Sequence, residues 1–234
     1  MDDTGFQRGN ALLNRHLTDD RRPDTFSLLG REWDLLDGVF SPVYTPVTAL
    51  FSTWLPYPPG GTFLEIGSGA GVTAVVAAQS GCRAVTALDI SMAAVENTRL
   101  NVARHGVEDR VRVLRSDLFS ELEPGEEFDL IYWNSNFAEA PADFANETDL
   151  HHAFFDPSYR AHSEFVAQAP RYLSPGGRLM LGFSNIGNTA LLTELCADVG
   201  LELCTYRSER RQVDQRTTVE FQLLELRARH SSSS

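Results

Sequence analysis

A glycine-rich loop is the feature of this sequence best suited to binding a charged ligand. The loop follows an apolar run over 62–66 and has glycines at alternate positions, Gly67, Gly69 and Gly71. Glycine permits positive φ and close approach of a ligand to the backbone, and the helix expected after the loop offers free N–H groups. The next apolar run ends in Asp89, where a carboxylate can accept hydrogen bonds from ribose hydroxyls. A nucleoside ligand fits this pattern better than a tight turn does.

The glycine spacing distinguishes between nucleoside cofactors. Dinucleotide sites favour G-x-G-x-x-G, which brings helix N–H groups to a pyrophosphate. Here the spacing is G-x-G-x-G, with Glu65 just before it. A carboxylate so close would repel a pyrophosphate but suits a cation. S-adenosyl-L-methionine carries a sulfonium and an ammonium group and no phosphate, so it is the expected cofactor, and a nicotinamide-dependent oxidoreductase is the less favoured alternative.

A second acidic position follows the strand expected over 111–115. Asp117 could accept a hydrogen bond from the exocyclic amine of adenine, while Ile90 and Leu118 cover the faces of the ring. Taken alone, Asp117 is equally consistent with a residue that caps a loop.

In this order, these motifs resemble those of the class I S-adenosylmethionine-dependent methyltransferases, over roughly residues 60–226. The resemblance implies a mostly parallel seven-stranded sheet with a reversed last strand. It also implies that Glu65 lies near the cofactor's amino group, Asp89 binds ribose and Asp117 binds adenine. The cofactor-binding set expected is Glu65, Gly67, Ser68, Gly69, Gly71, Asp89, Ile90, Asp117, Leu118 and Asn134.

The segment 128–137 carries the residues expected to receive the methyl group. Its end, Asn134 to Phe137, resembles the Asn-Pro-Pro-Tyr/Phe motif of methyltransferases that modify amide or amino nitrogens, where the Asn side chain and a backbone carbonyl bind the target NH₂. Ser135 and Asn136 replace both prolines, and proline would fix φ and remove a donor. Asn134 and Phe137 are therefore expected to be catalytic. The alternative is that Asn134 merely ends a strand.

Two further stretches, 28–46 and 153–177, resemble the subgroup that methylates a glutamine side chain in release factors. That subgroup carries a longer N-terminal domain, whereas only about 55 residues precede the core here. The expected reaction is therefore methylation of a nitrogen or oxygen of a small molecule, with methylation of a protein glutamine as the alternative. A cofactor-binding protein without activity is a further alternative, because both prolines are absent.

The loop 138–159 is expected to form a second wall of the pocket. It contains His152, which could take a proton from the nucleophile as a catalytic base; a solvated loop is the alternative. No metal site is expected, since the adjacent His151 and His152 point apart and no metal-ligand spacing is present.

The positions of these residues require strands that alternate with helices, which predicts a doubly wound α/β sheet. The expected strands cover 62–66, 84–89, 111–115, 128–132, 177–183, 201–207 and 217–226, with the last two joined by a polar run over 208–216. The expected helices cover 5–17, 43–54, 70–80, 92–105, 160–173 and 188–199. The proline-rich stretch 55–61 divides an N-terminal lid, 1–57, from a cofactor domain, 58–230.

Composition limits the expected partners. The 234 residues include 20 Lys+Arg and 32 Asp+Glu, a net charge of −12, which argues against a nucleic-acid substrate. No apolar run is long enough to span a membrane, and the first residues do not resemble a signal peptide. Three scattered cysteines favour a reducing cytoplasm. Exposed N-terminal aromatics are compatible with a homodimer.

Overall fold

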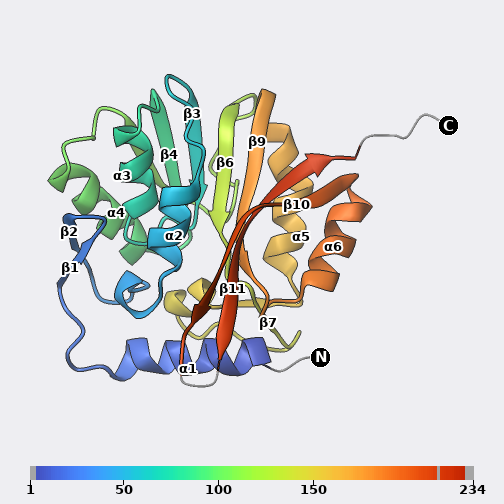
Figure 1. Ribbon diagram of the computed structural model, residues 1–234. Coiled ribbons are helices and arrows are strands. Elements are labelled where there is room, and N and C mark those ends of the chain that lie inside the picture. The colour runs from blue at the N-terminus through green and yellow to red at the C-terminus, as the bar shows by residue number, and fades with distance from the viewer. Residues whose placement is uncertain (1–3, 215–216, 230–234) are drawn as a thin grey trace.

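The computed structural model has a central seven-stranded sheet with helices on both faces (Figure 1). The structure describes residues 4–214 and 217–229. The first three residues, on which the expected lack of a signal peptide partly rests, and residue 230, the expected end of the cofactor domain, lie outside the described residues.

The sheet confirms the predicted doubly wound topology. Its strands are β3 (Thr62–Ile66), β4 (Ala84–Asp89), β5 (Val111–Arg115), β6 (Phe128–Asn134), β9 (Leu173–Ser184), β10 (Leu201–Gln212) and β11 (Thr218–Ala228). Their order is β10-β11-β9-β6-β3-β4-β5. The neighbouring strands β5, β4, β3, β6 and β9 pair in parallel, whereas β11 is antiparallel to both of its neighbours. The reversed last strand is therefore present.

Helices cover the two faces because the strands are apolar at successive positions. One face carries α2 (Val47–Trp54), α3 (Val72–Gln79) and α4 (Met92–Arg104), and the other carries α5 (Arg160–Gln168) and α6 (Thr189–Asp198). Phe63 belongs to the first apolar core, and its neighbour Leu64 belongs to the second. Leu130 and Ile131 divide between the two cores in the same way.

Several element ends differ from the sequence prediction. The helix expected over 160–173 ends at Gln168 and continues as a 3₁₀ turn, η3 (Ala169–Tyr172), since Pro170 has no N–H to extend an α-helix. Strand β9 begins at Leu173, before the strand expected over 177–183. The polar run 208–216 begins as strand, up to Gln212, because its charged side chains pair across the hairpin: Arg210 lies 2.8 Å from Glu220.

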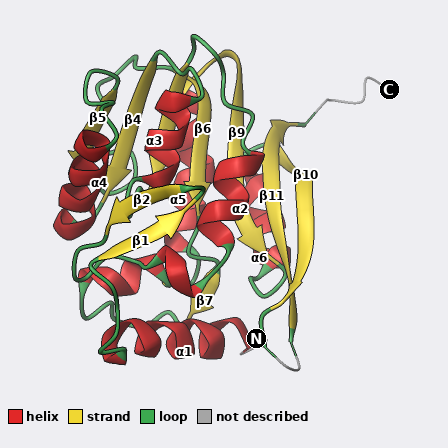
Figure 2. Ribbon diagram, turned by 60° about the vertical axis from the view of Figure 1, so that its left-hand side comes forward, coloured by secondary structure: helices red, strands yellow, loops and turns green. Residues whose placement is uncertain are grey.

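The N-terminal segment contains α1 (Thr4–Thr18), the hairpin β1 (Thr25–Leu28) with β2 (Arg31–Asp34), and a 3₁₀ turn η1 (Pro42–Tyr44). The hairpin was not predicted. It packs on α4, where Asn97 and Asn101 bond the backbone of Asp34. Trp33 and Phe51 share an apolar core with Phe63, while the domain boundary at residue 57 stays a prediction. Figure 2 shows α1 lying across the end of the sheet toward which the parallel strands point.

The loop 138–159 has structure of its own. It forms the strands β7 (Ala138–Ala140) and β8 (Phe155–Pro157), which pair in parallel, with a 3₁₀ turn η2 (Asp149–Ala153) between them. Helix α1 packs against β7. Among residues 4–214 and 217–229, no helix is long and apolar enough to cross a membrane.

Candidate cofactor and acceptor site

A cavity of about 570 Å³ lies at the carboxyl ends of the parallel strands, beneath α1. It brings together most of the site residues predicted from the sequence. Those that line it are Glu65, Gly67, Ser68, Gly69, Asp89, Ile90, Asp117, Leu118, Asn134, Phe137 and His152. The cavity has two parts, a polar part around the glycine loop and an aromatic part beneath α1.

Asp89 holds the glycine loop in shape. One carboxylate oxygen accepts a hydrogen bond from Gly69 N at 2.9 Å, and the other accepts one from Ser91 N at 3.0 Å. Gly69 has a φ of 55°, and a Cβ added there would meet no atom within 4 Å. The loop backbone is therefore open to the cavity at this residue, as close approach of a ligand requires.

Gly71 does not line the cavity. Its φ is 76°, and a Cβ added there would lie 2.9 Å from Thr98 on α4. The Thr98 hydroxyl also lies 2.9 Å from Ser68 Oγ. Gly71 thus allows the loop to pack against α4, and direct contact of Gly71 with the cofactor stays a prediction.

Glu65 carries a buried carboxyl group that could pair with a cationic ligand. Its side chain lines the cavity, yet Glu65 is only 2% exposed, and Oε2 has no hydrogen-bond partner in the described part of the chain. Burial raises the pKa of Glu65 to about 8, although nearby Thr73 and the backbone of Ala74 oppose this shift. A ligand ammonium group would supply the missing partner, so the residues present fit the amino acid end of the expected cofactor.

The opposite end of the polar part is formed by residues 116–118. Ser116 N donates a hydrogen bond to the Asp89 carbonyl at 2.8 Å, and Ser116 Oγ donates one to the Leu118 carbonyl at 2.8 Å. Leu118 has a φ of 48°, a costly conformation for a residue with a side chain. These bonds fix the backbone that places Asp117 and Leu118 at the cavity, while their contact with adenine stays a prediction.

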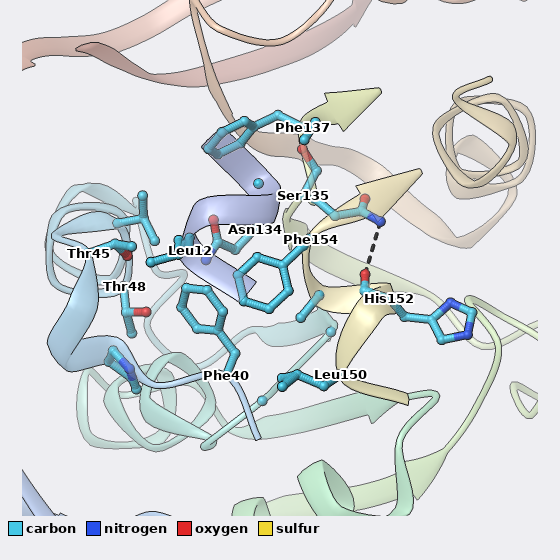
Figure 3. Close-up of a pocket in the computed structure, with 18 of the residues that line it drawn as sticks. Leu12, Phe40, Thr45, Thr48, Asn134, Ser135, Phe137, Leu150, His152 and Phe154 are labelled. Carbon is cyan, nitrogen blue, oxygen red and sulfur yellow. Dashed lines mark hydrogen bonds between the residues drawn. The ribbon is translucent and has the colours of Figure 1, made fainter. Parts of the chain in front are cut away.

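Asn134 lies between the polar and aromatic parts, at the end of β6. Figure 3 shows its side chain beside Phe154 and Phe40, with Leu12 close by. The Asn134 amide makes no hydrogen bond to any residue the structure describes, so it is free to bind a ligand. Leu12, Phe40 and Phe154 were not predicted individually as pocket residues. The available signals were the aromatic content of the N-terminal segment for Phe40 and the expected second wall over 138–159 for Phe154.

Hydrogen bonds replace the missing prolines after Asn134. Ser135 donates to the Gly182 carbonyl twice, from its backbone N at 3.2 Å and from its hydroxyl at 2.9 Å. The Asn136 amide nitrogen donates to the carbonyls of His152 at 3.0 Å and Phe155 at 2.8 Å. The segment is therefore tied to β9 on one side and to the loop 138–159 on the other.

His152 and His151 have different surroundings. The His152 ring points away from Asn134 and Phe40 (Figure 3), and its Nδ1 lies 3.0 Å from the Asn146 amide nitrogen. Burial lowers the pKa of His152. His151 Nδ1 instead lies 2.8 Å from Thr148 Oγ1 and caps η2. A role for His152 as a base stays a prediction.

Curated relatives are named for methylation of protein and RNA. The chain is 46% identical over 77 residues to a release factor glutamine methyltransferase of Rhodopirellula baltica, covering 32% of this chain and 26% of that protein. It is 28% identical over 182 residues to a ribosomal protein uL3 glutamine methyltransferase of Francisella tularensis, covering 73% and 57%. It is 34% identical over 148 residues to a ribosomal RNA small subunit methyltransferase C of Pasteurella multocida, covering 62% and 40%. The chain thus spans less than two thirds of each relative's length.

These relatives correct the partner predictions. A small-molecule acceptor was expected and nucleic acid was excluded, yet the relatives are named for ribosomal RNA, ribosomal protein and release factor substrates, so both expectations are wrong. The net charge of a whole chain does not decide whether it binds nucleic acid, because binding depends on the charge beside the site. Two arginines of α1, Arg8 and Arg15, line the cavity together with acidic residues, and Arg8 pairs with Asp214 at 3.1 Å. The homodimer stays a prediction.

Solved structures and a family model agree with the fold. The T. thermophilus 16S rRNA N2 G1207 methyltransferase, solved with AdoMet and guanosine, matches with a TM-score of 0.60 and 22% identity, covering 89% of this chain and 50% of that one. The model of the methyltransferase small domain matches residues 34–199, which is more than half of the sequence. The resemblance to class I methyltransferases is thereby confirmed, and the chain belongs to the methyltransferase small domain family.

Proposed function

We propose that this chain uses S-adenosyl-L-methionine to methylate the nitrogen of a primary amide, namely a glutamine side chain in a protein. The observation that carries the proposal is the free Asn134 amide, which lies between the glycine loop and an aromatic recess in one cavity. The glutamine methyltransferases among the relatives support the same substrate class.

The polar part of the cavity supplies the groups that would hold the cofactor. Glu65 would pair with its ammonium group, the open backbone at Gly69 would lie along its methionine end, and Asp89 and Asp117 would bind ribose and adenine. When bound, the cofactor supplies an electrophilic methyl group on a sulfonium sulfur.

The aromatic part would orient the acceptor. The Asn134 side-chain oxygen would accept a hydrogen bond from the target NH₂, while Phe40 and Phe154 would pack on the flat amide and exclude water. Alignment of nucleophile and methyl group is the main requirement of such a displacement. As the new nitrogen–carbon bond forms, the sulfur leaves with its electron pair, and the nitrogen then loses one proton to the solvent outside the aromatic part.

The exocyclic amine of a nucleobase is the second candidate acceptor. It is also a flat NH₂ group, and aromatic rings such as Phe40 and Phe154 can stack on a base. The relative named for ribosomal RNA methylation matches over 148 residues, which supports this candidate.

Transfer of a labelled methyl group would decide between these acceptors. The chain is incubated with labelled S-adenosyl-L-methionine and with a release factor, ribosomal proteins or ribosomal RNA, and the labelled product is mapped by mass spectrometry. We expect label on a glutamine, and its loss in Asn134→Ala with binding of S-adenosylhomocysteine retained. Label on RNA alone would favour the second candidate, and full activity of Asn134→Ala would overturn the role of Asn134.

A further inference from the structure

We propose that Asn136 is a positioning residue whose side-chain amide sets the acceptor slot between Asn134 and Phe154. The inference rests on the proposed function, because it concerns the acceptor half of the same cavity. Asn136 follows Asn134 by two residues, yet its side chain does not face the acceptor as a reacting group. It bonds instead to the opposite wall.

The two hydrogens of the Asn136 amide are both used. They go to the carbonyls of His152 and Phe155, at 3.0 and 2.8 Å (the dashed line in Figure 3 marks the first). These carbonyls lie on either side of residues 153–154, so one side chain holds the backbone of the segment that carries Phe154. No other residue type of the same size offers two donors in this geometry.

The segment 152–155 carries the aromatic wall of the acceptor slot. Phe154 is 5% exposed, and its ring lies 5.5 Å from that of Phe40 and 5.0 Å from that of His16. Phe40 and His16 come from the N-terminal segment, so the position of Phe154 also determines how this segment closes over the cavity. A shift of residues 152–155 would therefore change the distance from Asn134 to the aromatic wall.

The segment 134–137 is also fixed on the side that faces β9. Asn136 therefore links two walls of the cavity and does not merely cap a loop. Ser135 is 3% exposed and donates twice to the Gly182 carbonyl of β9. Asn134 is thus held by the sheet and Phe154 by Asn136. Proline rings would make this segment rigid in the related motif. Here the hydrogen bonds of Ser135 and Asn136 hold it in place, and those of Asn136 also reach the facing wall.

Asn136→Asp tests the link, because it keeps the size of the side chain and, when ionised, removes both donors and sets a negative charge against the carbonyls of His152 and Phe155. We expect kcat for methyl transfer to fall about 100-fold, the cost of a misplacement near 1 Å, and the KM for the acceptor to rise. The KM for the cofactor and the affinity for S-adenosylhomocysteine should stay unchanged, since Asn136 touches neither the glycine loop nor Asp89. Asn14→Asp, the same change on the exposed face of α1, is the matched control.

Amide hydrogen exchange provides a readout that needs no acceptor. Phe154 N donates to the His151 carbonyl at 3.0 Å, and exchange at Phe154 should become faster in Asn136→Asp and in Asn136→Ala. Unchanged exchange, or unchanged kcat with faster exchange, would overturn the proposal. Loss of S-adenosylhomocysteine binding in both variants would also overturn it, because Asn136 would then serve the whole fold. If the wild-type chain methylates no acceptor while exchange responds as expected, the proposed function fails and the link remains.

Discussion

Glu65 gives cofactor binding a pH dependence whose sign follows from its burial. Its pKa is raised to about 8, so the carboxyl group is largely protonated at neutral pH when no cation is near. A ligand ammonium group favours the ionised form. Binding must therefore release a proton from Glu65, and affinity should increase as pH rises toward the raised pKa.

We expect the affinity for S-adenosylhomocysteine to increase from about pH 6 to about pH 7.5, a range below the ordinary pKa of an α-amino group, by at most about tenfold per pH unit. Glu65→Gln cannot ionise and should bind weakly with a flat profile. Calorimetry in two buffers of different ionisation enthalpy measures the proton released. Equal pH slopes for the two proteins would contradict this assignment.

Among the roles predicted from the sequence, that of His152 as a catalytic base has the least support from the geometry of the site. A general base contributes about 10²–10⁴-fold to a rate, but this ring points away from Asn134 and its Nδ1 faces the Asn146 amide. We therefore expect His152→Gln to lower kcat less than tenfold, well below the usual contribution of a base, and to leave the pH profile of kcat unchanged. A larger loss, with a lost acidic limb in the profile, would restore the base assignment.

At the scale of elements, helix α1 covers the aromatic part of the cavity and depends on a glycine for its packing. A Cβ at Gly9 would lie 2.6 Å from Phe155 Cε1 and 3.3 Å from Ala138 Cβ. Phe155 is 1% exposed, so its ring has no room to move. The close approach of α1 to β7 and β8 therefore requires a residue without a side chain at position 9.

Gly9→Leu should force α1 away from this wall at a cost of about 1–3 kcal/mol, although leucine favours the helix itself. We expect a lower melting temperature, impaired methyl transfer and unchanged binding of S-adenosylhomocysteine, because the glycine loop does not touch Gly9. Thermal unfolding and calorimetry measure these effects. Asn14→Leu, on the exposed face of α1, is the control, and an equal loss there would assign the effect to helix surface rather than packing.

The elements of the core and helix α1 could be predicted from the sequence, whereas the β1–β2 hairpin and the elements of the loop 138–159 could not. Apolar runs such as 62–66 and 84–89 are buried on both faces and predict strands directly. The β1–β2 hairpin was missed because its turn places Leu29 at a φ of 53° before Gly30 at 72°, where an Asn-Gly pair is the usual signal. The structure of loop 138–159 depends on Asn136 and α1, which no local pattern reveals.

The same contrast applies to the site. The cofactor side comes from three strand ends, each followed by its own motif, so local sequence was sufficient to predict most of the residues that line the cavity there. Gly71 is the exception, because it packs against Thr98. The acceptor side is assembled from Leu12, Phe40 and Phe154, which lie far apart in the chain. Only tertiary packing brings them to Asn134, and the nature of the acceptor was accordingly the prediction that failed.

At the scale of the whole molecule, the polar part of the cavity is connected to helices on both faces of the sheet. Ligand binding there should therefore stabilise the entire fold. Asp89 at the end of β4 holds the loop that begins α3, and Trp133 at the end of β6 packs with α5 through Phe165. The cavity is lined by both of these strand ends. A ligand that contacts them binds the folded state and not the unfolded chain, which raises the free energy of unfolding.

At a ligand concentration of about 100 times Kd the gain is about 2.7 kcal/mol, which for a chain of this length corresponds to about 5–10 °C in melting temperature. We expect this shift with S-adenosylhomocysteine and none with a nicotinamide dinucleotide, because the loop has the spacing G-x-G-x-G and not the G-x-G-x-x-G of dinucleotide sites. Asp89→Ala should abolish the shift, while Glu96→Ala, which removes an exposed carboxylate on α4, should retain it. A dinucleotide shift that equals or exceeds that of S-adenosylhomocysteine would instead identify the glycine loop as a pyrophosphate site.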